Sequence, residues 1–343
     1  MELQAFGLIN WLVLGAYLCA NIVLGFVLSK KVTTADDFFV GQRNIPWWAI
    51  GISVVATYVS ALSFLGGPAW AYTEGLSVIA IHLNYPLVIF IVVAFFLPFF
   101  FNSGVASIYE YLEKRFGPTS RSLIAAIFLV SQTLTSAAVL YATALVLEFI
   151  TGMPVIYAII IITLIALIYT IMGGLAAVIW TDVIQALILL VGALIITVSL
   201  INNLSLPLGE TLEILKSEGK TNPLNFSFDT TQVSTVWTGV IAMTLFHITV
   251  YGANQMMVQR TLASKNIGDA KKSFLMMGYL AIFIYFLFFL LGILFYSYYG
   301  GRDFDNGNTI ILDFASSLAI PGLMGIIAAA VIAASMSSLD SAF

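Results

Sequence analysis

Three oxygen-bearing side chains near the end of the sequence are spaced so that they could bind a cation. Ser337, Asp340 and Ser341 follow an i, i+3, i+4 spacing, which places them on one face of a helix. Asp182 is a second carboxylate, set in the largely apolar stretch Trp180–Gln185. Hard cations prefer oxygen ligands, and one or two carboxylates with hydroxyls and carbonyls suit a monovalent ion that must bind and leave. The pattern predicts a monovalent cation site.

Each aspartate also has a structural interpretation. Asp182, with Thr181, would serve as an N-cap if a helix began there. Asp340 could be an interfacial carboxylate, although apolar sequence continues to Phe343. Ionisable groups inside apolar spans are costly and indicate function by default. Two such aspartates could also share a proton in an intramembrane aspartyl protease, but those enzymes carry Gly-X-Gly-Asp, which neither aspartate here follows.

The only two histidines, His82 and His247, both lie in apolar sequence. A buried neutral histidine that is hydrogen-bonded to a neighbouring helix is one interpretation, and a binding group is the other. The residues alone leave both open.

The composition indicates which environment must hold these side chains. Hydrophobic residues make up 61% of the 343 residues and charged residues 9%, which is too little polar surface for a water-soluble globule of this size. The net charge of −4 has no basic run that would suit a nucleic acid, and the single cysteine, Cys19, can form no internal disulfide. The chain is expected to lie in a lipid bilayer.

Nine apolar stretches are near the roughly 20 residues that a bilayer requires, and they lack the alternation of a β-barrel strand. Backbone groups in lipid must bond within their own segment, so these stretches predict helices. They lie at about 6–28, 46–73, 77–101, 120–150, 153–173, 178–201, 233–257, 273–298 and 309–343.

The distribution of basic residues predicts the orientation of these spans. With the N-terminus outside, ten of the 13 Lys and Arg residues, Arg260 among them, fall in inner loops. Cytoplasmic loops carry such an excess, so the N-terminus is expected outside and residue 343 on the cytoplasmic side. The first span is longer than a signal-peptide core, and we expect it to be retained.

Two of the nine spans are rich in small and helix-weakening residues. These are the second, at Gly51–Pro68, and the seventh, at Phe246–Gln255, which lie five helices apart. Unwinding at membrane depth frees carbonyls for a cation and N–H groups for a substrate. Close helix packing through small residues is the structural alternative.

Four motifs, in order along the chain, resemble the sodium/solute symporter family, which includes sodium-coupled sugar, proline, sialic acid and monocarboxylate transporters. They are Thr34–Gly41, Ser107–Phe116, Tyr169–Gln185 and Tyr251–Lys265. The resemblance implies an all-α polytopic membrane protein with a LeuT-type inverted-repeat fold. A leading helix (6–28), a first repeat (46–201), an extracellular loop (202–232) and a partial second repeat (233–343) would then form one transporter domain.

The resemblance also implies site residues. Those of the common sodium site would be the carbonyls of Ala56, Val59 and Ala334 and the hydroxyls of Ser337 and Ser338. A second cation site would use Asp182, Ser337, Asp340 and Ser341, with Asp340 standing where related proteins carry serine. The substrate pocket would be lined by Ser60, Ser63, His82, His247 and Tyr251.

The substrate class stays divided between a sugar or polyol and a small organic acid. His82 and His247 replace the glutamate and asparagine that sugar transporters of the family use at the matching positions. Thr135 occupies the region where sialic acid transporters place an arginine, so that carboxylate clamp is missing.

Sodium-coupled symport of a small organic solute by alternating access is the function that the resemblance implies, with sodium as the co-transported ion. The chain would be an integral protein of the plasma membrane, without an obligate protein partner and not an enzyme. Members of the family continue past the ninth span, so we expect the chain to be C-terminally incomplete. A sensor that keeps the transporter fold is the other interpretation.

Overall fold

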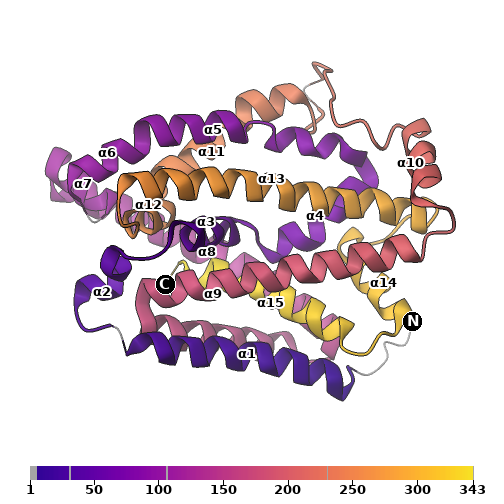
Figure 1. Ribbon diagram of the computed structural model, residues 1–343, viewed down its shortest axis with the longest axis horizontal. Helices are drawn as coiled ribbons and strands as arrows, with labels where there is room; N and C mark the ends of the chain where they lie inside the picture. Colours follow the sequence, from indigo (N-terminus) through magenta and orange to yellow (C-terminus); the bar gives the residue numbers. More distant parts are fainter. Residues whose placement is uncertain (1–5, 31, 106, 230, 343) are drawn as a thin grey trace.

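The computed structural model describes residues 6–30, 32–105, 107–229 and 231–342, which form a bundle of helices (Figure 1). Among these residues there is no β-strand, only an isolated bridge between Ile45 and Ser264. Six described helices are long and apolar enough to cross a membrane: Leu8–Ser29, Ala61–Ser103, Pro118–Thr151, Val155–Asn202, Ile267–Tyr298 and Leu323–Asp340. The predicted all-α membrane class is confirmed.

The first half of the chain carries the helices that surround the first predicted break. These are α1 (Leu8–Ser29), α2 (Ala35–Val40), the 3₁₀ turn η1 (Gly41–Arg43), α3 (Trp47–Tyr58), α4 (Ala61–Glu74), the 3₁₀ helix η2 (Gly75–His82), α5 (Tyr85–Ile91), the π-helix η3 (Val92–Phe96), α6 (Leu97–Ser103), α7 (Ile108–Phe116), α8 (Pro118–Thr151) and α9 (Val155–Asn202).

The second half follows an outer loop. It contains α10 (Leu208–Ser217), the π-helix η4 (Thr238–Ala242), α11 (Met243–Ile248), the π-helix η5 (Thr249–Ala253), α12 (Gln255–Leu262), α13 (Ile267–Tyr298), the 3₁₀ turn η6 (Gly307–Thr309), α14 (Ile310–Leu318) and α15 (Leu323–Asp340).

Helix α9 contains both the fifth and the sixth predicted span. Its backbone leaves helical geometry only at Gly174, with φ of 58° and ψ of −154°. A side chain is excluded there, because a Cβ would lie 2.5 Å from the carbonyl oxygen of Phe38. Figure 1 shows α9 as two rods that meet near α2.

Two other predicted spans are divided differently in the structure. The third is not one α-helix, because it is made of four short segments in turn: the 3₁₀ helix η2, α5, the π-helix η3 and α6. The ninth is wrong as a single helix: it separates into α14 and α15, with Ala319 in the left-handed region between them.

Both predicted breaks exist. Val59 and Ser60 are extended between α3 and α4. In the seventh span the break lies near the end of the predicted stretch Phe246–Gln255: residues 247–251 remain helical and Asn254 is extended, with ψ of 131°. The π-helical turns of η5 keep the backbone wound up to Ala253.

Helix α15 lies at the centre of the bundle, in contact with α1, α3, α8 and α9. It reads Leu323-Met-Gly-Ile-Ile-Ala-Ala-Ala-Val-Ile-Ala-Ala-Ser335, and nearly all of it is buried. Small side chains allow neighbouring helices to approach closely in a membrane protein. The Ser337–Ser341 segment is thereby brought against the first break.

The connecting elements gather at opposite ends of the bundle in Figure 1. The short helices α2, α7 and α12 lie at one end, and α10, α14 and the start of α1 lie at the other. Loops predicted to be cytoplasmic therefore share one end.

Candidate functional site

A small cavity of about 10 Å³ lies beside the break between α3 and α4. This is room for about one water-sized species. It is lined by Val55, Ala56, Val59, Gln185, Ala186, Leu189, Ile284, Ala333, Ala334 and Ser337. Four of the five residues expected at the common sodium site are in this lining.

Ser338, the fifth, bridges the same two helices. Its hydroxyl lies 3.3 Å from the carbonyl oxygen of Thr57 and 3.4 Å from that of Ala334. The end of α3 and the last turns of α15 thus present carbonyl and hydroxyl oxygens to each other, which is the ligand chemistry of a sodium ion.

Asp182 is fully buried and accepts hydrogen bonds on both carboxylate oxygens. The hydroxyl of Ser337 donates to Oδ1 at 2.5 Å, and that of Ser53 donates to Oδ2 at 2.5 Å. Asp182 lies two turns into the second rod of α9, so its interpretation as an N-cap is wrong. The helix after Gly174 continues unbroken through it.

Arg260 forms an ion pair with Asp182 that sequence reasoning missed. Its Nη2 lies 3.2 Å from Oδ2, its Nε donates to Ser53 at 2.8 Å, and Nη2 also donates to Ser341. The side chain is 2% exposed. Assignment of Arg260 to a cytoplasmic loop is therefore wrong, because α12 turns it into the bundle. No local signal marks it, because α12 also carries Gln255, Gln259 and Thr261.

Asp340 lies close to the same cluster but has different partners. The phenol of Tyr169 donates to its Oδ2 at 2.6 Å, and the hydroxyl of Thr181 lies 3.4 Å from the same oxygen. Ser341 lies 3.4 Å from Oδ1. Its exposure of 2% excludes the interfacial interpretation.

The structure thus brings Asp182, Ser337, Asp340 and Ser341 together, as the resemblance implies. Within this cluster Arg260 supplies one positive charge against two carboxylates. Counted as ionised, they leave one negative charge uncompensated at a buried site, where charges need partners. The arrangement can hold one further monovalent cation.

A second cluster surrounds the ends of α3, η2 and α11, and we call it the aromatic box. It consists of Tyr58, His82, Tyr85, His247, Tyr251 and Tyr285. Three of these, His82, His247 and Tyr251, belong to the expected substrate lining. Sequence reasoning missed the other three, which are tyrosines in apolar stretches without a distinguishing spacing.

His247 is hydrogen-bonded through both ring nitrogens. Its Nε2 lies 3.1 Å from the hydroxyl of Tyr58, and its Nδ1 lies 2.8 Å from the amide nitrogen of Asn84. The expectation of a buried histidine bonded to neighbouring helices is confirmed for this residue. Its partners come from the first break and from the start of α5.

His82 is held mainly by ring stacking. Its ring lies 3.8 Å from that of Tyr285 and is tilted by 19° from it, and Tyr85 lies parallel on another side at 5.4 Å. Its Nδ1 is buried and has no hydrogen-bond partner among the described residues. For His82, the prediction of a buried histidine that is hydrogen-bonded to a neighbouring helix is therefore not confirmed at Nδ1.

Of the remaining residues expected to line the substrate pocket, two are hydrogen-bonded to tyrosines of the aromatic box and one is not. Tyr251 donates to or accepts from Tyr85 at 3.1 Å, and the hydroxyl of Ser63 lies 3.5 Å from that of Tyr285. Ser60 begins α4 and makes no side-chain hydrogen bond to the described part of the chain.

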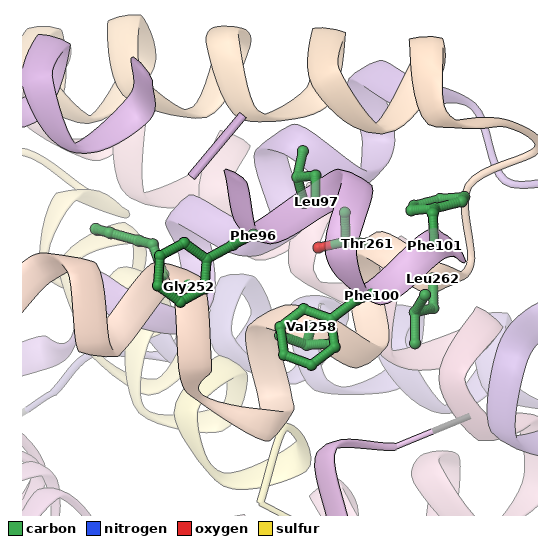
Figure 2. Close-up of a pocket in the computed structure, with 9 residues that line it drawn as sticks. Phe96, Leu97, Phe100, Phe101, Gly252, Val258, Thr261 and Leu262 are labelled. Atoms are coloured by element: carbon green, nitrogen blue, oxygen red, sulfur yellow. The ribbon is translucent and has the colours of Figure 1, made fainter. Parts of the chain in front are cut away.

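Behind Tyr251, side chains from α6 and α12 meet around a second cavity of about 10 Å³ (Figure 2). Figure 2 shows Phe96 beside Gly252, and Phe100 over Val258. Phe96, Leu97, Phe100, Phe101, Val258 and Leu262 make this wall apolar, with Thr261 as a hydroxyl-bearing member. Tyr251 is the member of the aromatic box that also lines this cavity.

Known proteins resemble this chain along its whole length. It is 34% identical over 353 residues to the sodium/sialic acid symporter SiaT of Proteus mirabilis, covering 99% of this chain and 70% of that protein. It is 30% identical to the sodium/glucose cotransporter of Vibrio parahaemolyticus, over 83% of this chain and 54% of the other. Human sodium-coupled monocarboxylate transporter 2 is 28% identical, over 99% and 57%.

A solved structure of a Na⁺-coupled sialic acid symporter, in a substrate-bound outward-open state with a novel Na⁺ site, has the same fold. Its TM-score is 0.91 at 33% identity, covering 98% of this chain and 72% of that one. The predicted LeuT-type fold is confirmed, although the number of spans is not.

The model of the sodium:solute symporter family matches residues 38–343. This match covers most of the chain and gives no support to the prediction of C-terminal incompleteness. The match identifies this integral membrane protein: the chain belongs to the sodium:solute symporter family.

Proposed function

We propose that this sodium-coupled symporter binds its sodium ion between the end of α3 and the last turns of α15. The ligands are the carbonyls of Ala56, Val59 and Ala334 and the hydroxyls of Ser337 and Ser338. The observation that carries this proposal is the ion-sized cavity, which has four of these residues in its lining. Several neutral oxygens give the weak binding that a transported ion needs.

A second monovalent cation binds at Asp182, Asp340, Ser337 and Ser341. The charge balance supports this site, because two buried carboxylates face a single guanidinium. For the cation to enter, hydroxyl protons that now point to the carboxylates must turn away, so that the oxygens serve as ligands. Asp340 adds the charge that a serine in this position would lack.

Transport of a small organic solute proceeds by alternating access around the aromatic box and the broken helices. Residues 46–201 and 233–343 act as the two repeats that move against each other. Residues 202–232 are extracellular, the N-terminus is outside, residue 343 is cytoplasmic, and the membrane is the plasma membrane. The gathering of α2, α7 and α12 at one end supports this orientation.

The two other interpretations from sequence find no support. The protease interpretation has no motif to support it, and the carboxylate oxygens of the two aspartates are bonded to Arg260, Tyr169 and serines. The family and the structural neighbour are transporters and not enzymes or sensors.

Binding of ²²Na⁺ to the purified protein tests the first site without any knowledge of the substrate. Ser338→Ala removes one ligand and should raise the sodium Kd about threefold to tenfold, since a hydroxyl contributes about 0.5–1.5 kcal/mol. Ser335→Ala is the matched control, because this buried hydroxyl on the same helix has no partner among the described residues. An unchanged Kd in Ser338→Ala would remove Ser338 from the site.

A further inference from the structure

A third cavity lies at the end of the bundle that carries α2 (Figure 1). Its volume is about 210 Å³, whereas each of the two cavities described above has about 10 Å³. It therefore has room for a group of several atoms rather than for a single water molecule. Its lining comes from the end of α1, from α2 and the turn after it, from the segment before α3, and from α9 just after its bend at Gly174.

Asp37 is the charged residue in the lining of this cavity. Its Oδ2 accepts three hydrogen bonds, from the N–H and hydroxyl of Thr33 and from the N–H of Thr34, at 2.8–3.0 Å. These bonds lower the pKa of Asp37 to about 2, so the carboxylate is ionised at physiological pH. Its Oδ1 accepts no hydrogen bond from a described residue, and Asp37 forms no ion pair with a described Lys or Arg. The cavity therefore presents a negative charge that a cation with N–H groups would match.

Trp180 and Asn44 add an aromatic ring and an amide to this lining. The face of an indole ring attracts an ammonium group, and an amide both donates and accepts hydrogen bonds. The ring of Trp180 lies 5.5 Å from that of Trp48 at an angle of 78°, a contact that fixes its position. A single ring does not make the aromatic cage that binds a quaternary ammonium. A primary ammonium that donates to Asp37 is the better match.

Two basic side chains flank the cavity. Lys30 is the C-cap of α1 and lies in the chain between Leu28 and Val32, which both line the cavity. Arg43 ends the turn η1 and directly precedes Asn44. Both basic side chains are exposed, and neither forms an ion pair with a described carboxylate. They can bind a phosphate at the rim while Asp37 binds a cation inside, which suits a zwitterion with the two charges a few bonds apart.

The surroundings of the cavity indicate a lipid as the source of this zwitterion. Trp47 and Trp48, at the start of α3, are 37% and 38% exposed, and tryptophan is enriched where a membrane meets water. On the last turns of α1, Val23, Phe26 and Val27 are 59%, 53% and 50% exposed, in a helix that is apolar enough to span a membrane. An acyl chain can therefore lie along α1 while its headgroup enters the cavity.

We propose that this cavity binds the headgroup of phosphatidylethanolamine, with the ammonium at Asp37 and the phosphate at Lys30 and Arg43. The proposal goes beyond sodium symport, because the cavity shares no lining residue with the proposed sodium sites or with the aromatic box. A phosphatidylcholine headgroup has no N–H to donate to the carboxylate, and a phosphatidylglycerol headgroup has no cation. The cavity should therefore select ethanolamine among phospholipids that have the same acyl chains.

Native mass spectrometry of the purified whole chain measures this selection. The probes are phosphatidylethanolamine, phosphatidylcholine and phosphatidylglycerol with identical acyl chains, each added to delipidated protein in detergent. The Kd for phosphatidylethanolamine should be about threefold to tenfold below the other two, which is the range expected of one partly exposed, hydrogen-bonded ion pair. An excess of soluble phosphoethanolamine should leave the lipid bound, because the soluble headgroup lacks the acyl chains that contribute to binding.

Asp37→Asn keeps an acceptor for the N–H groups of Thr33 and Thr34 but removes the charge. It should raise the Kd for phosphatidylethanolamine to that for phosphatidylcholine and leave the Kd for phosphatidylcholine unchanged. Asp269→Asn is the matched control. Asp269 is likewise the third residue of a helix, its N–H is likewise bonded to the side chain of the N-cap residue, here Asn266, and it does not line the cavity.

Ala176→Leu is a second variant, which fills part of the cavity and leaves Asp37 unaltered. It should raise the Kd for phosphatidylethanolamine at least as much as Asp37→Asn does, and it decides the question if the Asp37→Asn protein does not fold. Equal Kd values for the three lipids would overturn the proposal, as would a preference for ethanolamine that persists in either variant. Displacement of the lipid by phosphoethanolamine would also overturn it, because the ligand would then be a soluble amine.

Discussion

Replacing Arg260 by methionine removes the only positive charge in contact with Asp182 among the described residues and keeps most of the side-chain volume. The guanidinium lies 3.2 Å from Oδ2 of Asp182 and also bonds to Ser53 and Ser341. Both members of the ion pair are almost fully buried, at 2% and 0% exposure. The substitution leaves a carboxylate buried without its counter-ion.

Breaking a buried ion pair by removal of one partner costs about 3–5 kcal/mol. At about 2–4 °C per kcal/mol, the variant in potassium buffer should unfold roughly 10 °C below the unsubstituted protein. Sodium should recover part of this loss, because a ligand at 100 times its Kd stabilises by about 2.7 kcal/mol. The sodium-induced shift in the unfolding temperature should be larger in Arg260→Met than in the unsubstituted protein, because a carboxylate without its guanidinium attracts the cation more strongly.

The assay is thermal unfolding of detergent-solubilised protein in sodium and in potassium chloride at equal ionic strength. Arg43→Met is the control, since Arg43 is an exposed arginine in a short turn. The double variant Asp182→Asn, Arg260→Met removes both charges and should regain about 2–3 kcal/mol relative to the sum of the single losses. Additive losses, or a sodium shift no larger than that of the unsubstituted protein, would refute this account of the site.

Three further outcomes are expected. Gly174→Ala should give a much lower yield of folded protein than Gly104→Ala, measured by quantitative gel filtration. Both glycines have positive φ, but only at Gly174 would a Cβ collide with backbone atoms. Gly252→Ala places a methyl 2.9 Å from the ring of Phe96, in the apolar wall behind Tyr251. We expect this wall to move when solute passes, so the substitution should slow solute uptake while ²²Na⁺ binding stays normal, and equal uptake rates would refute that movement. Hydrogen bonds from Thr33 and Thr34 lower the pKa of Asp37 from 3.8 to about 2. The ionised carboxylate therefore stabilises the fold fully above about pH 4, and this stabilisation is lost as the pH falls towards 2. Asp37→Asn should remove that part of the acid sensitivity, measured as unfolding temperatures over a series of pH values.

The membrane class and the first break could be predicted because both depend on local composition. Apolar runs of about 20 residues have few alternatives to a membrane helix, and Val59–Ser60 lies among small residues that hold a helix weakly. The second break lies within the predicted Phe246–Gln255, but composition could not show which of these residues is extended, since π-helical turns at Thr249–Ala253 keep the backbone wound almost to its end. The presence of Gly252 could not show whether this stretch unwinds or forms a π-helical turn.

Residue type pointed to the carboxylates of the proposed second cation site, but it did not reveal the charge balance around them. Carboxylates in apolar sequence indicate function wherever they lie, which is why Asp182 and Asp340 could be singled out. Arg260 was counted with the loop cations, because a basic residue near the end of an apolar stretch has the same local sequence whether its helix turns it inward or outward. Only the packing of α12 against α3, α6 and α13 decides this.

By itself, the sequence determined an all-helical membrane protein with a polar face at Ser337, Asp340 and Ser341, since hydropathy and helical spacing are properties of neighbouring residues. The tertiary structure alone decided which distant side chains share a site. It joined Arg260 to Asp182 and Asn84 to His247, and contacts between residues this far apart depend on how whole helices pack. Helix packing thereby decides which charged groups meet at the proposed cation site and which side chains are hydrogen-bonded in the aromatic box.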